Sequence, residues 1–198
     1  MQHLGTMAGL GLLLAASPGF ADEFTCLGPF ARDTDHKRLM AAFGPDHVRL
    51  ETVQEPEGMK SKASIVFPED PAKRLEVVWR DGKSLRHPIR IDLVGSDWSA
   101  PKGLRVGASI EEVEKANGKP FVLYGFEWDY GGTVAGWNGG ALGHLPGGCA
   151  LYPVFEAEDT ASDDVLDAVS GDARFPSDSP LMKAAQPRIR SLALRFPH

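Results

Sequence analysis

Two carboxylates that can do chemistry stand two residues apart in the segment GFEWDY, at Glu127 and Asp129. In an extended strand they share one face, and three aromatic residues share the other: Phe126, Trp128 and Tyr130. The strand rise separates the two carboxylates by roughly 6.5–7 Å, within the spacing of an inverting glycosidase. Because both project in parallel from one strand instead of flanking a bond, the alternative is an amphipathic strand with its acids in water and its aromatic residues in the core.

A glycine-rich stretch follows this pair, and Trp137 and Asn138 lie within it. An indole ring and a side-chain amide can stack on a sugar and hydrogen-bond to it, so both residues are candidates for a binding site, with core packing as the alternative for Trp137. A glycine-rich loop can also hold phosphate, but no Gly-Lys-Ser/Thr sequence follows this one. Hairpin turns therefore explain the glycines better than a nucleotide site.

Other catalytic and metal-binding motifs are absent from the sequence. Around Ser96 the sequence Gly-Ser-Asp lacks the second glycine of a nucleophile elbow. No HExxH or Cys-x-x-Cys pattern occurs, and the histidines beyond the first 21 residues are scattered: His36, His47, His87, His144 and His198. The sequence therefore predicts no metal site and no cofactor.

Residues 1–21 have the features of a secretory signal peptide. Residues 7–16 carry no charge and are followed by Pro18 and the small-residue sequence Gly19-Phe20-Ala21. The apolar run is too short to span a bilayer, so we expect cleavage after Ala21 and no membrane span. The leader predicts a mature protein in the periplasm.

Charge and cysteine content narrow the partners and the compartment further. The formal net charge of −6 disfavours nucleic acid and anionic membrane surfaces. In an oxidising compartment, an even cysteine count without metal-type spacing predicts one disulfide, between Cys26 and Cys149. Two free thiols, or a catalytic cysteine, are the alternatives.

Hydrophobic periodicity in residues 22–100 predicts one helix followed by four strands. The helix covers residues 34–43, where Leu39, Met40 and Phe43 share a face. Turn-forming residues separate the predicted strands, which cover residues 48–53, 63–67, 75–80 and 89–94.

Residues 101–198 repeat this order. Ser109 and Glu112 form the S-x-x-E pattern of a capping box, and Gly118 ends the helix. Four predicted strands follow, over residues 121–130, 133–137, 149–156 and 189–196. We therefore predict an α+β fold with helices packed on antiparallel sheet, arranged as two tandem units of one helix and four strands. A single α+β domain is the alternative.

An acidic insertion, residues 156–187, interrupts the last hairpin of the second unit. Ser162 is in position to cap a short helix, and Gly171 closes it. Acidic residues dominate the insertion before Arg174, which suits a cation site or an acidic docking face. The alternative is a solvated helix whose carboxylates favour its positive N-terminal end.

A group of uncharacterised bacterial exported proteins resembles this chain in two segments, GLRVGASIEEVEKANGKPF at residues 103–121 and GFEWDYGG at residues 125–132. More broadly, the chain is similar to the β-lactamase-inhibitor-protein fold, in which a Gly-x-Ser/Thr-x-x-x-Val helix and a Gly-x-Pro turn precede an antiparallel sheet. Five residues match that spacing: Gly107, Ser109, Val113, Gly118 and Pro120. The first half lacks the glycine before its helix. The resemblance implies a module that binds proteins and catalyses nothing.

These features predict an exported, non-enzymatic protein that binds an envelope protein or a glycan through the hairpin of residues 124–142. Its expected binding residues are Glu127, Asp129, Trp137 and Asn138. One rival is a carbohydrate- or peptidoglycan-acting hydrolase that uses Glu127 and Asp129, and another is a small-ligand carrier with its site between two sheets. The position of the two carboxylates, in a cleft beside Trp137 or in open solvent, distinguishes these classes.

Overall fold

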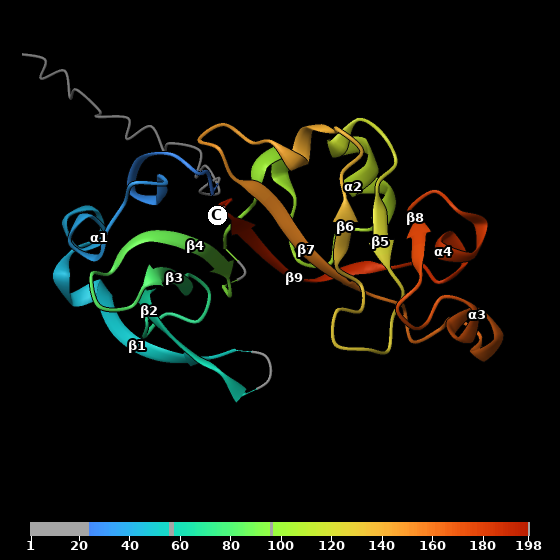
Figure 1. The fold of residues 1–198 in the computed structure, drawn as a ribbon, viewed down its shortest axis with the longest axis horizontal. Helices are drawn as coiled ribbons and strands as arrows, with labels where there is room; N and C mark the ends of the chain where they lie inside the picture. The colour runs from blue at the N-terminus through green and yellow to red at the C-terminus, as the bar shows by residue number, and fades with distance from the viewer. Residues whose placement is uncertain (1–23, 56–57, 96, 198) are drawn as a thin grey trace, which may run out of the picture.

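The computed structural model describes residues 24–55, 58–95 and 97–197. Within these residues the chain forms an α+β fold of four α-helices and nine β-strands (Figure 1). The helices are α1 (His36–Phe43), α2 (Ile110–Asn117), α3 (Asp163–Ala168) and α4 (Pro180–Ala184). The strands are β1 (Val48–Gln54), β2 (Lys60–Val66), β3 (Leu75–Asp81), β4 (Arg86–Leu93), β5 (Val122–Tyr124), β6 (Val134–Gly136), β7 (Ala150–Glu156), β8 (Arg174–Pro176) and β9 (Arg188–Arg195).

The strands form two antiparallel sheets. The larger has six strands in the order β1-β2-β3-β4-β9-β7, and the smaller has three in the order β6-β5-β8. Strand β4 pairs with β9, so strands from both halves of the chain join in one continuous sheet. In Figure 1, β7 and β9 run between the first-half strands and the smaller sheet.

Helices α1 and α2 begin at residues whose side chains cap them. The Asp35 side chain accepts a hydrogen bond from the Arg38 backbone N–H (2.8 Å) at the start of α1. At α2, Ser109 and Glu112 form the predicted capping box, and Gly118 ends the helix with φ of 82°. Local sequence signals therefore set both helices.

One contiguous apolar core joins α1, α2 and both sheets. Cross-strand neighbours on four adjacent strands form its centre, and each is at most 1% exposed: Val77, Ile91, Leu194 and Leu151. Burial of such side chains is the main stabilising contribution to the fold.

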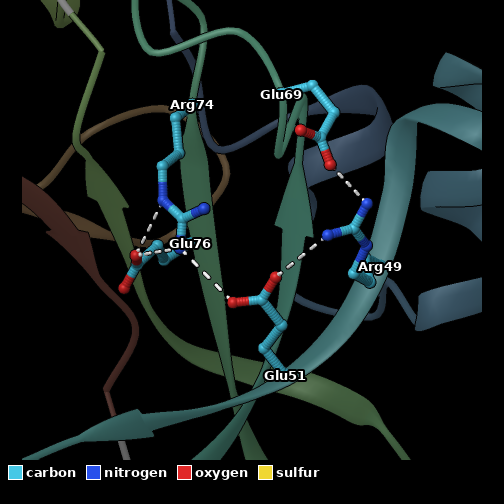
Figure 2. A network of polar contacts seen from close by, with 5 residues as sticks. All are labelled: Arg49, Glu51, Glu69, Arg74 and Glu76. Carbon is cyan, nitrogen blue, oxygen red and sulfur yellow. Dashed lines mark hydrogen bonds and ion pairs between the residues drawn. The ribbon is translucent and has the colours of Figure 1, made fainter.

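The opposite face of the larger sheet carries an ion-pair network (Figure 2). Arg74 lies 2.8 Å from Glu76 and 3.6 Å from Glu51, and Arg49 contacts Glu51 (3.9 Å) and also Glu69. A small apolar cluster is fully buried on the same face: Ala63, Ile65 and Val78. Charged side chains thus line the face of the sheet that the main core does not use.

Arg90 on β4 extends this charged face toward β9. Its Nε donates to both Asp92 carboxylate oxygens (2.8 Å), and its two terminal nitrogens donate to Glu55 (3.1 and 3.2 Å). Burial raises the pKa of Asp92, and the positive charge of Arg90 offsets part of that rise. Two carboxylates therefore already neutralise Arg90.

The predicted elements of the first half are confirmed with shifted ends. Helix α1 begins at His36 because Asp35 occupies the N-cap position. Strands β1 to β4 lie where the sequence predicts them, and β2 and β4 begin earlier, at Lys60 and Arg86.

The second half departs further from the prediction. The strand predicted over residues 121–130 is wrong beyond Tyr124, where β5 ends and a loop begins. Within the insertion, β8 was not predicted and pairs with β5. The four strands predicted here therefore divide between the two sheets. The assignment of residues 22–100 and 101–198 as tandem units stays a prediction.

Three predicted features remain: the short helix of the insertion, the leader and the lack of a membrane span. Ser162 is the N-cap residue of α3, but its side chain makes no capping hydrogen bond. The leader, residues 1–21, lies outside the described residues. Among the described residues, no helix has the length and apolar character needed to cross a membrane.

The predicted disulfide is confirmed. Cys26 and Cys149 are bonded, with their Cα atoms 6.2 Å apart. Cys149 directly precedes β7, so the bond ties the N-terminal segment to the larger sheet.

Candidate binding groove

Residues 125–132 form a closed loop between β5 and β6, and glycines at both ends fix its position. A Cβ atom on Gly125 would lie 2.6 Å from the Val169 carbonyl oxygen. A Cβ atom on Gly132, whose φ is +71°, would lie 1.9 Å from the Phe155 carbonyl oxygen. Because a side chain would collide with backbone at both positions, only glycine lets the loop pack this closely.

Hydrogen bonds within the loop hold its shape. The Gly132 backbone N–H donates to the Gly125 carbonyl (3.1 Å), and the Gly131 N–H donates to the Trp128 carbonyl (2.9 Å). The Trp128 indole N–H also donates to the Gly125 carbonyl (3.1 Å). The loop therefore presents its side chains from an ordered frame.

The aromatic side chains of the loop do not share one buried face. Phe126 is buried, but Trp128 is half-buried and Tyr130 is 53% exposed, so the prediction of an all-core aromatic face is wrong. Glu127 adopts φ of 64°, which takes the backbone out of the extended conformation. The Trp128 ring packs between Tyr124 and Tyr130, with centroids 5.4 and 5.3 Å away.

A groove of about 560 Å³ lies between this loop and strands β7 and β9. Trp128 and Tyr130 line it from the loop, and Tyr152 lines it from β7. Two arginines of β9, Arg190 and Arg195, line it as well. The guanidinium carbon of Arg195 lies 3.4 Å from the centre of the Tyr152 ring, a cation–π contact that fixes both side chains.

The charges around the groove are largely unpaired. Four exposed carboxylates line it without a hydrogen bond or ion pair to any other described residue: Glu127, Asp129, Glu156 and Asp159. A fifth, Glu158, pairs with Arg188. Arg190 has no charged partner among the described residues either. The groove therefore offers free negative charge near the loop and free positive charge on β9.

Trp137 and Asn138 lie at the far end of β6 and do not line this groove. The Trp137 indole N–H donates to the Leu151 carbonyl (3.2 Å), and its ring lies 5.2 Å from that of Phe121. The Asn138 side chain donates to the Pro120 carbonyl (3.1 Å). Both side chains secure the turn after β6.

The four residues predicted for the site therefore separate in space. Glu127 and Asp129 line the groove together, beside Trp128 and not beside Trp137. Their side chains project from a loop, so the strand geometry expected for them does not hold.

Sequence reasoning missed Tyr152, Arg190 and Arg195. Alternation along β7 places Tyr152 on the other face of the sheet from the buried Leu151. Alternation along β9 likewise places Arg195 on the other face from the buried Leu194. That signal was present in the sequence. The sequence does not show that β7 pairs with β9, and this pairing brings the three side chains together.

One serine and histidine pair also meets in the fold, under α1. The His36 Nδ1 atom lies 2.7 Å from the Ser64 hydroxyl, which also accepts a hydrogen bond from the Trp79 indole N–H (2.9 Å). Burial lowers the pKa of His36, and the nearby Asp35 charge opposes that shift. Ser64 is fully buried, so the pair attaches α1 to the sheet and is closed to a substrate.

No cluster of three or more His, Cys, Asp or Glu side chains within the described part of the chain is arranged to hold a metal ion. No protein-family model matches the sequence, and no curated protein matches it significantly. Among solved structures, the chain is similar to the crystal structure of the uncharacterized protein yfeY from Escherichia coli. The two share 16% sequence identity and a TM-score of 0.42, over 83% of this chain and 90% of the other. Values this low support no transfer of function.

Proposed function

We propose that the chain is an exported, non-enzymatic protein that binds a protein partner of the cell envelope through the groove beside residues 126–131. The observation that carries the proposal is an ordered loop that holds Glu127, Asp129 and Tyr130 exposed over a groove with unpaired charges. Protein interfaces combine exposed aromatic side chains with complementary charges in this way.

The two carboxylates favour binding over hydrolysis. A glycosidase needs one carboxyl group held protonated, usually by burial, and a second that faces it across the bond. Glu127 and Asp129 are both exposed and project from one short loop. Contact with a charged partner uses exposed carboxylates directly.

Two further observations support this class and its compartment. The residues that match the inhibitor-protein fold, Gly107 to Pro120, include the Ser109 capping box and the Gly118 helix end that the structure contains. The bond between Cys26 and Cys149 suits an oxidising compartment, as the predicted leader does.

Photo-crosslinking in cells tests the proposal. A photoreactive amino acid in place of Tyr130, in the full-length chain, should form one discrete adduct with an envelope protein. The double variant Glu127→Gln, Asp129→Asn should reduce this adduct roughly tenfold, because two charged contacts of ~0.5–1 kcal/mol each are lost.

Matched controls exist among exposed residues outside the groove. Leu181 on α4 is 47% exposed, and a photoreactive group there should not form the adduct. Glu111→Gln with Asp172→Asn removes the same charges from two exposed residues outside the groove and should leave the adduct unchanged. Hydrolysis of peptidoglycan that disappears with Glu127→Gln or Asp129→Asn alone would instead establish the hydrolase.

A further inference from the structure

A second hollow of about 590 Å³ adjoins the groove on the charged face of the larger sheet. Four residues line both hollows: Tyr152, Val154, Arg190 and Arg195. The second hollow continues across β9 and β4 to Glu55, just beyond the end of β1. The two hollows therefore meet at the Tyr152–Arg195 contact.

The second hollow is predominantly apolar. Its apolar lining comes from Leu93 on β4, from Val94 directly after β4, and from Leu192 on β9. Val106, in the segment before α2, completes it. Val94 is 53% exposed and Val106 is 55% exposed. Arg90 also lines the hollow, but Glu55 and Asp92 already bind its guanidinium group. This end therefore offers apolar surface and little free charge.

The chemical character of the surface thus changes in order along the two hollows. Free carboxylates lie at the loop end, with Glu127 and Asp129 among them. Arg190 lines both hollows, and the exposed apolar side chains of Val94 and Val106 line only the second. A ligand that matches all three regions carries a basic group, then an acidic group, then an apolar group.

A polypeptide has this variety of side chains, and an extended one directs alternate side chains to the same face. A glycan would need free aromatic faces for stacking. Arg195 covers one face of Tyr152, and a neutral sugar has no charged group to pair with the free carboxylates or with Arg190. Charge complementarity therefore favours a peptide over a sugar polymer.

We propose that the two hollows form one continuous groove that binds an extended peptide segment of the partner protein. Basic side chains of the peptide contact Glu127 and Asp129, an acidic side chain contacts Arg190, and an apolar side chain fills the hollow beside Val94 and Val106. This assignment rests on the proposed function and adds the chemistry of the partner to it.

Two synthetic peptides serve as probes: fluorescein-labelled Lys-Ser-Lys-Ser-Glu-Ser-Leu-Ser and the same residues in reverse order. In each, the lysines, glutamate and leucine point to one face of an extended chain. Fluorescence anisotropy with the full mature protein should detect binding of at least one of them. Replacing the peptide's leucine by serine should weaken that binding about tenfold, as the loss of one buried leucine predicts.

Variants of the protein locate the contacts. Val106→Asp should weaken the leucine peptide about tenfold and leave the weaker binding of the serine peptide unchanged. The double variant Glu127→Gln, Asp129→Asn should weaken the binding of both the leucine and the serine peptide. The control Glu111→Gln, Asp172→Asn should weaken the binding of neither. Circular dichroism confirms that each variant is folded.

The proposal is wrong if neither peptide binds, or if Val106→Asp has no effect on the leucine peptide. It is also wrong if a chitin tetrasaccharide binds with the same dependence on Glu127 and Asp129 while the peptides do not. In each case, an adduct at Tyr130 that still depends on the two carboxylates leaves the proposed function standing. Loss of that dependence contradicts the proposed function itself.

Discussion

Asn117 is the buried polar residue that connects the end of α2 to the turn after β6. It is 2% exposed, and its side-chain amide donates to the carbonyls of Lys119 (2.9 Å) and Trp137 (3.2 Å). Its oxygen accepts a hydrogen bond from the Leu142 backbone N–H (3.2 Å). A Cβ atom on Gly140 would lie 2.1 Å from that oxygen, so the turn packs directly on the amide. The Asn117 side chain thus makes hydrogen bonds to three backbone groups, those of Lys119, Trp137 and Leu142.

Replacing Asn117 by Ala should therefore lower the free energy of unfolding by about 2–3 kcal/mol, since buried carbonyl and amide groups lose their partners. Urea denaturation followed by tryptophan fluorescence measures this loss. Asn138→Gly is the matched control, because it removes one exposed hydrogen bond and suits the φ of 53° at that position. The control should change stability by no more than about 0.5 kcal/mol. An equal loss in the two variants would contradict the role given to Asn117.

Helices α2 and α3 form a matched pair at the scale of elements, because a serine begins each of them. The Ser109 side chain accepts a hydrogen bond from the Glu112 N–H, and the Glu112 carboxylate accepts one from the Ser109 backbone N–H. The Ser162 side chain makes no such bond at α3. Ser109→Ala should cost about 1 kcal/mol of stability and Ser162→Ala close to nothing, as measured by thermal or urea unfolding. A comparable loss from Ser162→Ala would show that the capping bond is not the cause.

The elements that sequence predicts well are those whose signals are local. Capping residues, alternation and turn residues lie within a few positions of the helix or strand they define, as at Ser109 and Gly118. The loop of residues 125–132 is different, because Gly125 and Gly132 are required by the backbone of Val169 and Phe155. Such contacts exist only once distant strands have come together.

The candidate site divides in the same way. The sequence identifies Glu127 and Asp129 as a pair because they lie two residues apart in one segment. Tyr152 and Arg195 lie on strands that are far apart in the sequence and adjacent in the sheet. Trp137 was a reasonable candidate by residue type, but its ring packs on Phe121. Residue type and spacing select side chains with useful chemistry, and strand pairing decides which of them meet.

At the scale of the whole molecule, the larger sheet separates two environments. One face carries the apolar core that α1 and α2 complete, and the other carries the ion pairs of Figure 2 and the groove. Because strands from both halves form this one sheet, the groove depends on contributions from β4, β7 and β9 together. The pairing of β4 with β9 therefore matters to the proposed binding as well as to the fold.

The bond between Cys26 and Cys149 acts on the whole chain, because it joins residues 123 positions apart. Constraining so long a loop in the unfolded chain stabilises the folded state by at most ~4–5 kcal/mol in the chain-entropy model. Cys26→Ala with Cys149→Ala should therefore lower the free energy of unfolding by about 3–4 kcal/mol in urea denaturation. The denaturant slope should rise, because an unfolded chain without the bond exposes more surface.

Oxidised wild-type protein and wild-type protein in a thiol reductant are the controls, and the reduced form should match the double variant. If the variant instead unfolded at the same urea concentration as the oxidised protein, the contacts of the N-terminal segment would be sufficient without the bond. Those contacts are close at Gly147, where a Cβ atom would lie 2.1 Å from the Cys26 carbonyl oxygen.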